Sequence, residues 1–162
     1  TSADGARLFY VRSEDKKPGG AVREITNGRE SLRFSEASGA LAILGITGPS
    51  LIVAHDPRPG EERVVVLKIE GGTVKPLFDL GARPSTLRLI PGFNAVSFSR
   101  RDARDVENLY VKKLDTLVET MVSANGIQGV SFSPASLMGP STLVFSQQLR
   151  NKDLGIIRLD RP

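Results

Sequence analysis

The sequence predicts an all-β fold made of about four repeats of one antiparallel, four-stranded unit. The first observation is that similar apolar segments recur along the chain at a spacing of about 45 residues. The second is that these segments are short, rich in β-branched, leucine and aromatic residues, and bounded by turn formers. The third is that no stretch carries a long amphipathic pattern with the 3.6-residue period of a helix.

The clearest series of segments defines a strand that we denote c. Its members are Gly19–Ile25 (GGAVREI), Val64–Glu70 (VVVLKIE), Leu109–Asp115 (LYVKKLD) and Leu154–Asp160 (LGIIRLD). Within the second member, Val64–Ile69 is apolar on both faces apart from Lys68. A near-continuous apolar run is typical of a strand in a sheet that is covered on two sides, whereas a half-exposed strand alternates.

A second series, strand b, precedes strand c in each repeat. Its members are Arg7–Val11, Leu51–His55, Val96–Arg100 and Ser141–Phe145. Strand d follows strand c, and strand a opens the next repeat. Strand d is expected at Ser31–Ser35, Thr73–Phe78 and Leu117–Val122, and strand a at Leu41–Ile46, Thr86–Ile90 and Val130–Ser133.

The predicted order is therefore b-c-d, a-b-c-d, a-b-c-d, a-b-c, or about 14 strands in four units. We expect a single repeat domain over residues 1–162, with units at approximately 1–39, 40–82, 83–126 and 127–162.

Turn residues support this register. Asn27-Gly28 and Gly71-Gly72 are hairpin signals, because Asn and Gly tolerate positive φ. Pro76 lies inside a predicted d strand, and proline lacks the N–H that a central strand must donate, so d is expected at a sheet edge. Residues 102–120 partly fit helical spacing, but their alignment with the other repeats favours strands.

Four-stranded antiparallel units of this length, arranged radially, are the blades of a β-propeller. The repeats resemble the TolB-type, WD-like propeller repeats of bacteria. The resemblance rests on Ser2–Gly5 (SADG), Ile25–Gly28 (ITNG), Asn108–Thr116 (NLYVKKLDT), Val130–Pro134 (VSFSP) and Asp153–Asp160 (DLGIIRLD). The chain departs from true WD repeats because it has no Trp and lacks the Gly-His and Trp-Asp dipeptides.

The first unit lacks strand a and the last lacks strand d, so the chain is expected to be a propeller or a partial propeller. Because closure of the ring removes exposed sheet edges, we expect another chain or further sequence to complete it. The resemblance implies a noncatalytic scaffold for protein–protein interaction, or alternatively the substrate-gating propeller portion of a larger hydrolase of the prolyl oligopeptidase type. It favours an extracytoplasmic location, periplasmic or secreted, over a cytoplasmic one.

The b–c connectors are the most charged part of the chain. They lie at Arg12–Gly20, Asp56–Arg63, Arg100–Asn108 and Gln147–Asp153, and hold nearly half of its 22 basic and 18 acidic residues. Their charges are nearly balanced and they contain no aromatic residue, whereas a nucleic-acid groove is one-sidedly basic with interleaved aromatics. We therefore expect no nucleic-acid partner.

The densest basic cluster in these connectors is Arg100, Arg101 and Arg104, which we predict as a candidate partner-binding loop. Guanidinium groups bind carboxylates or phosphates bidentately. The neighbouring acids at 102, 105 and 107 would neutralise much of the positive field. The alternative interpretation is an ordinary solvated turn.

Catalytic signatures are missing from the sequence. His55 is the only histidine and ends a predicted strand, there is no cysteine, and no nucleophile elbow, P-loop or Gly-x-Gly-x-x-Gly motif occurs. A metal site of several imidazoles or thiolates is therefore excluded within one chain. No apolar run approaches the length of a membrane span. We expect no enzyme activity and no cofactor.

Overall fold

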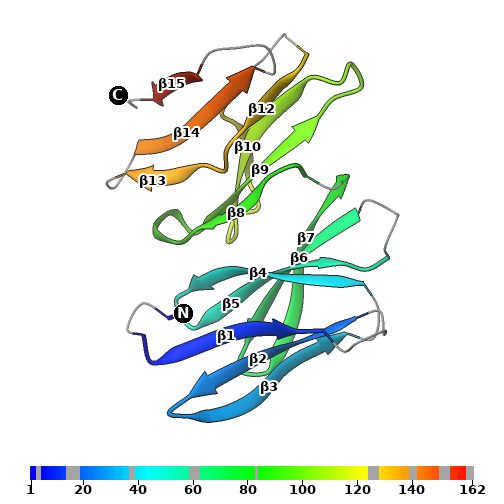
Figure 1. Cartoon of the computed structure of the whole chain (residues 1–162), viewed down its shortest axis with the longest axis vertical. Coiled ribbons are helices and arrows are strands. Elements are labelled where there is room, and N and C mark those ends of the chain that lie inside the picture. The colour runs from blue at the N-terminus through cyan, green and yellow to red at the C-terminus, as the bar shows by residue number, and fades with distance from the viewer. Residues whose placement is uncertain are drawn as a thin grey trace. The chain divides into compact units, whose positions relative to one another are not determined.

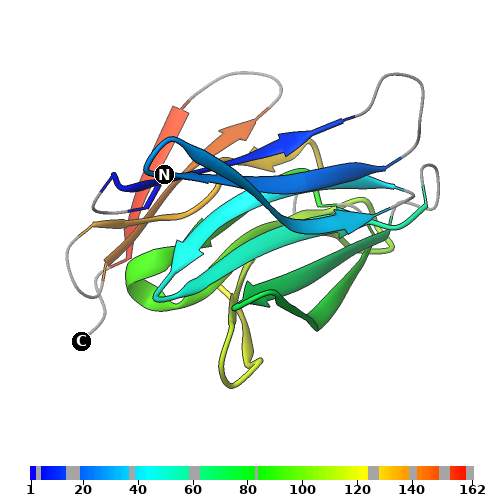
Figure 2. The ribbon, with the colours of Figure 1, turned by 90° about the horizontal axis from the view of Figure 1, so that it is seen from below.

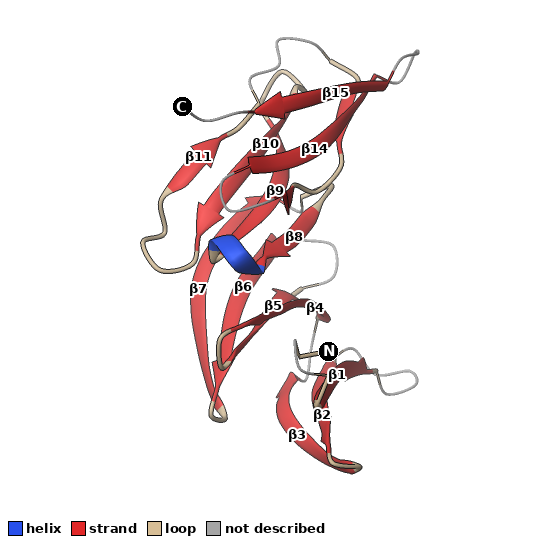
Figure 3. Cartoon of the chain, turned by 90° about the vertical axis from the view of Figure 1, so that its left-hand side faces the viewer, coloured by secondary structure: helices blue, strands red, loops and turns tan. Residues whose placement is uncertain are grey.

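The computed structural model describes residues 1–2, 5–13, 19–36, 39–58, 63–82, 84–123, 128–138, 142–149 and 154–159. The chain divides into two compact units, residues 1–83 and 84–162. Each unit contains two antiparallel sheets (Figure 1). The expected all-β fold is confirmed: the only helical segment among the described residues is one short 3₁₀ turn, blue in Figure 3.

The first unit contains seven strands in two sheets. Sheet A has the order β1-β2-β3, with β1 at Arg7–Arg12, β2 at Gly20–Thr26 and β3 at Arg29–Glu36. Sheet B has the order β4-β5-β6-β7, with β4 at Ala40–Thr47, β5 at Ser50–Asp56, β6 at Arg63–Glu70 and β7 at Thr73–Ala82. Neighbouring strands are antiparallel and consecutive in sequence, so each sheet is a simple meander.

Tight turns join these strands where the sequence predicts them. Asn27 and Gly28 both have positive φ, 51° and 73°, and connect β2 to β3. Two successive left-handed residues form the turn whose twist matches that of a β-hairpin. Gly71 and Gly72 play the same part between β6 and β7, with φ of 56° and 85°.

The core of the first unit lies between sheets A and B, where the blue strands of sheet A are layered on the cyan β4 and β5 (Figure 2). Val22 of β2 clusters with Leu51 and Val53 of β5 and with Ile69 of β6. These residues alternate with others along their strands, because successive side chains in a strand point to opposite faces. Sheets A and B thus share one apolar layer.

The second unit contains the remaining strands in two more sheets. Sheet C has the order β11-β10-β9-β8, with β8 at Leu87–Ile90, β9 at Ala95–Arg101, β10 at Glu107–Lys113 and β11 at Glu119–Met121; the 3₁₀ turn η1 at Pro91–Phe93 joins β8 to β9. Sheet D contains β12 at Val130–Phe132, β13 at Ser136–Met138, β14 at Thr142–Leu149 and β15 at Leu154–Leu159. Its core with sheet C is built around Leu109, Phe132 and Phe145, and the two phenylalanines meet edge to face.

Each predicted a, b, c and d segment contains a strand, although β11 is shorter than the predicted Leu117–Val122, and residues 102–120 form no helix. Of the predicted strand residues, Ser141 and Asp160 lie outside the described part of the chain. One strand was not predicted: β13. Strands β12 and β13 both pair with β14, at its opposite ends, so together they take the place of one a strand. Pro134 explains the interruption, because it has no N–H to donate to β14.

The residues beside Pro134 find other hydrogen-bond partners. The Ser133 hydroxyl accepts the Ser146 N–H at 2.7 Å. The backbone N–H of Ala135 donates to the Ser97 hydroxyl of sheet C at 3.1 Å. The break in the strand therefore becomes a hydrogen-bonded link between sheets C and D.

The position predicted for Pro76 is also confirmed. Pro76 lies in β7, which is an edge strand of sheet B. The register between β6 and β7 shifts next to the partner of Pro76, between Val66 and Leu67. Because only one side of an edge strand is paired, the missing N–H costs the sheet little there.

Candidate partner-binding loop

The predicted arginines lie around the loop that joins β9 to β10 in sheet C. Its chain reversal is short: the Asp102 N–H donates to the Val106 carbonyl, and the Asp105 N–H donates to the Asp102 carbonyl, both at 3.0 Å. Asp105 has a φ of 59°, a left-handed conformation that Asp tolerates better than most residues. The other three b–c connectors lie partly outside the described residues.

The Asp102 carboxylate holds this loop from inside. Its Oδ1 atom accepts the backbone N–H groups of Arg104 at 2.8 Å and of Val106 at 3.0 Å. The hydrogen bond from Val106, followed by that from Arg104, holds the pKa of Asp102 below its usual value. The loop therefore has a definite shape that its own side chain fixes.

Arg104 lies at the exposed tip of the loop. Its guanidinium contacts Asp102 Oδ2 through Nη2 at 3.1 Å and through Nε at 3.3 Å. The Arg104 carbonyl accepts a hydrogen bond from Gln128 Nε2 at 2.7 Å. An exposed pair of this kind contributes little to stability, so Arg104 can exchange its carboxylate for another without a large penalty.

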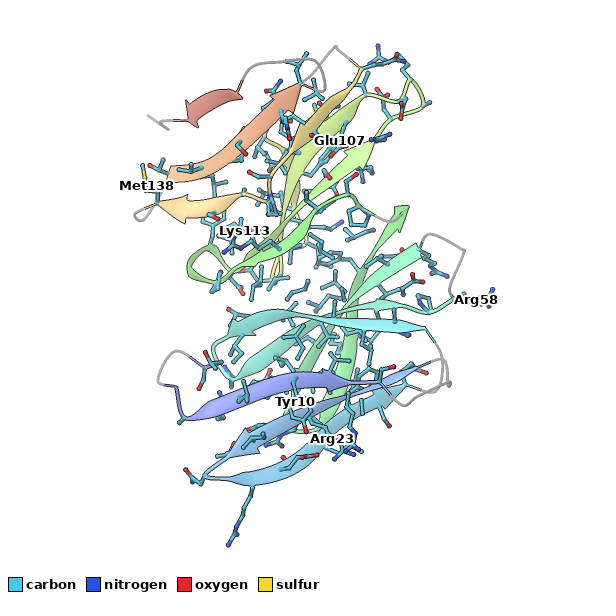
Figure 4. All side chains as sticks on the ribbon, viewed as in Figure 1. Tyr10, Arg23, Arg58, Glu107, Lys113 and Met138 are labelled. Atoms are coloured by element: carbon cyan, nitrogen blue, oxygen red, sulfur yellow. The ribbon has the colours of Figure 1, made fainter. Side chains whose placement is uncertain are left out.

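Arg101 ends β9 and contacts two acids. Its Nη1 atom lies 2.9 Å from Asp105 Oδ1, and its Nε atom lies 3.4 Å from Glu107 Oε2. Glu107, labelled in Figure 4, is only 1% exposed, and its Oε2 atom also accepts the Ser85 hydroxyl at 3.4 Å. Its Oε1 atom has no hydrogen-bond partner among the described residues.

Arg100 faces the opposite side of sheet C from Arg101, because adjacent residues in a strand alternate. Its guanidinium carbon lies 4.3 Å from the centre of the Tyr110 ring, and Nη2 donates to Glu119 Oε1 at 2.7 Å. Tyr110 in turn stacks on Phe98, with ring centres 5.6 Å apart. Arg100 is therefore fixed by an aromatic face and a carboxylate.

The three arginines accordingly do not converge on one point. Each is paired with at least one carboxylate, and they are distributed over the two faces and the tip of the loop. This arrangement is unsuited to hold a single phosphate or carboxylate between all three. The loop presents positive and negative side chains in alternation. Such a surface is complementary to a protein surface on which the charges alternate with the opposite signs. That this loop binds a partner stays a prediction.

Two carboxylates that the sequence does not single out are buried. The charge pattern places Glu107 in a charged connector, and Glu24 lies within a predicted c strand. Glu107 shares a face of β10 with Leu109, and Glu24 shares a face of β2 with Val22, so both point to the core side. The alternation of the apolar residues could have revealed both.

His55 lies in β5, as predicted, and is buried next to the end of that strand. Among the residues that the structure describes, no group of three or more His, Asp and Glu side chains is arranged to hold a metal ion. In the same part of the chain, no helix has the length and apolar character needed to cross a membrane.

Comparison with known proteins shows a likeness of fold. No family model matches the sequence, and no curated protein matches it either. Among solved structures, the chain is similar to the crystal structure of TolB from Acinetobacter baumannii, with a TM-score of 0.58 and 13% sequence identity. The match covers 91% of this chain but only 39% of the TolB chain. At this identity the likeness concerns the fold alone: nearly all of this chain is folded like somewhat less than half of TolB.

Proposed function

We propose that this chain is part of a noncatalytic β-propeller that acts as a scaffold for protein–protein interaction, within a larger protein or assembly. The observation that carries the proposal is the repeated a-b-c-d order of strands, combined with a structural likeness that spans less than half of the TolB chain. The TolB-type repeats that the sequence resembles form propeller blades. A ring of such blades needs more strands than this chain supplies.

The outer face of sheet A supports this proposal. Leu8 and Leu32 are 45% and 54% exposed, and they lie on the face opposite to the buried Val22. Tyr10 and Arg23, which are paired across β1 and β2, lie on that same outer face (Figure 4). In a closed propeller a neighbouring blade covers each such face, so an uncovered one is expected where a ring is incomplete.

Sheet D has a similar feature. Met138 on β13 is 48% exposed and lies on the face of sheet D opposite to the buried Leu143. Exposed apolar side chains on the outer faces of sheets A and D are expected of a ring that other residues complete. An extracytoplasmic location belongs to the same proposal, since it follows from the same resemblance.

Sedimentation velocity tests the proposal. The mass of one chain is 17.5 kDa, and we expect the isolated chain to sediment as a multiple of it, increasingly so at higher concentration. The double substitution Leu8→Ser and Leu32→Ser should shift the distribution toward the single chain, because it removes apolar area from sheet A. Val118→Ser is the matched control, since Val118 is also exposed but lies in the second unit, outside sheets A and D.

A wild-type chain that keeps its β-sheet circular dichroism and stays at 17.5 kDa at every concentration would contradict the proposal. So would an effect of Val118→Ser as large as that of the double substitution, since association would then not involve the outer face of sheet A.

A further inference from the structure

A cavity of about 160 Å³ lies in the first unit, between sheets A and B. Its polar lining consists of Arg7 from β1, Glu24 from β2 and Arg33 from β3. Its apolar lining includes Phe9, Leu51 and Ile69, which belong to or border the core of this unit. The cavity thus combines two guanidinium groups, one carboxylate and an apolar wall.

Glu24 is the negative group of this cavity, and it already has its partners. The side chain is almost fully buried, at 2% exposure. Its Oε1 atom accepts the Thr26 hydroxyl at 2.6 Å, and its Oε2 atom accepts Arg33 Nε at 2.5 Å. A buried carboxylate requires such a counter-ion. Arg33 therefore neutralises Glu24.

Arg7 is the second cation of the cavity, and its positive charge also acts on Glu24. Its guanidinium carbon lies 5.6 Å from the centre of the Phe9 ring, and its side chain makes no hydrogen bond to any other described residue. Arginine carries five N–H donors in a planar fork, and these are normally satisfied by a carboxylate, a phosphate, backbone carbonyls or water. The cavity therefore has one net positive charge, and the Arg7 guanidinium adds its donors to the lining.

The volume restricts what can enter. A cavity of about 150 Å³ holds a molecule the size of benzene. This space accordingly accommodates a carboxylate joined to a small branched apolar group, with the carboxylate on Arg7 and the apolar group against Leu51 and Ile69. A larger anion such as a nucleotide does not fit.

We propose that this cavity binds a carboxylate carried on a small apolar group, with Arg7 as the residue that holds the carboxylate. Two sources present this chemistry: a free short-chain branched organic acid, and the C-terminal residue of a peptide that ends in Val or Leu. The site lies within the first unit, so it does not depend on whether the chain belongs to a propeller ring.

The test is a binding titration followed by ¹H–¹⁵N NMR, with four probes. They are 3-methylbutanoate, its neutral amide, N-acetyl-Ala-Val with a free carboxylate, and the same peptide as its C-terminal amide. We expect at least one carboxylate probe to saturate shifts at the Phe9 and Glu24 amides, and its matched amide to bind about tenfold more weakly or not at all. The carboxylate probe that binds identifies the source.

The variant Arg7→Gln isolates the proposed contact, because it removes the guanidinium but leaves the Glu24–Arg33 pair intact. We expect it to weaken carboxylate binding at least about tenfold. Arg29→Gln is the matched control: Arg29 is an exposed residue of the same sheet outside the cavity, so its loss changes the net charge equally and should leave binding unchanged. Arg33 is unsuitable, since its removal would leave Glu24 buried without its counter-ion.

The proposal is overturned if neither carboxylate probe binds, if the amides bind as tightly as the acids, or if Arg7→Gln and Arg29→Gln have equal effects. Circular dichroism of both variants confirms that a loss of binding is not a loss of fold. Because the measurement concerns one chain and one cavity, its outcome is separate from the sedimentation result.

Discussion

The hydrogen bond between Ser97 and Ala135 allows a direct test of how sheets C and D are joined. Ser97 is fully buried, and its hydroxyl accepts the Ala135 N–H at 3.1 Å while donating weakly to the Ala135 carbonyl at 3.5 Å. Ser97→Ala removes the acceptor and leaves a buried N–H without a partner. Such an orphaned group costs about 1–3 kcal/mol, and the long bond to the carbonyl adds little to this.

Tyrosine fluorescence makes the measurement specific for the second unit. The chain has no Trp and two Tyr, of which Tyr110 lies in β10. In a Tyr10→Phe background, Tyr110 is the sole fluorophore. For a urea dependence of about 2 kcal/mol per M, a loss of about 2 kcal/mol lowers the unfolding midpoint by about 1 M.

Ser131→Ala is the matched control, because the Ser131 hydroxyl contacts the Gln148 carbonyl at 3.5 Å in an exposed position. Water can replace that contact, so we expect a change of less than about 0.5 kcal/mol. Equal unfolding midpoints for Ser97→Ala and Ser131→Ala would refute the reasoning, because the buried Ser97–Ala135 hydrogen bond would then make no special contribution to stability.

Three further predictions concern other parts of the chain. Burial raises the pKa of Glu24, but hydrogen bonds from Thr26 and Arg33 outweigh it and hold that pKa below its usual range. The resulting stabilisation is present above the unfolded-state pKa near 4.3 and is lost as the pH falls through the folded-state value. The unfolding free energy of Glu24→Gln, measured by urea titration, should therefore vary less with pH than that of wild type below about pH 5. At Gly39, with a φ of 82°, an added Cβ would lie 1.8 Å from the Asp56 carbonyl oxygen. In urea unfolding, Gly39→Ala should therefore lower the unfolding free energy by about 3 kcal/mol or more. Gly28 is also left-handed but has open space around it, so Gly28→Ala should lower the unfolding free energy by only about 1 kcal/mol. Asp102→Ala should speed hydrogen exchange at the Arg104 and Val106 amides, because both lose their acceptor. Arg104→Ala should leave both amides protected, and equal exchange in the two variants would contradict the role given to Asp102.

Most of the fold could be predicted because its signals are local and repeated. Each strand is a short apolar run between turn formers, and a faint signal in one repeat is reinforced by the same position in the others. Asn27-Gly28 and Gly71-Gly72 need no distant partner to form their turns. The edge position of Pro76 follows from the chemistry of proline alone.

The features that were missed depend on partners distant in sequence. Strand β13 follows the interruption at Pro134, where the Ala135 N–H bonds to Ser97, 38 residues away. The Glu24–Arg33 pair and the cavity beside it require two sheets to be packed together first. Arg100, Arg101 and Arg104 are neighbours in sequence, but strand alternation and the shape of the turn separate their side chains, which spacing alone did not reveal.

The loop between β9 and β10, which the Asp102 carboxylate closes, has a consequence for the entropy and the rate of association. Because Asp102 already caps the Arg104 and Val106 amides, the segment has little conformational freedom left to lose on association. A molecule that binds this loop would contact a preorganised surface, so recognition would depend on how well its charges complement the fixed charges of the loop. Lengthening this turn by one or two glycines would keep every charged residue, but it would restore conformational freedom and so slow the formation of a productive encounter.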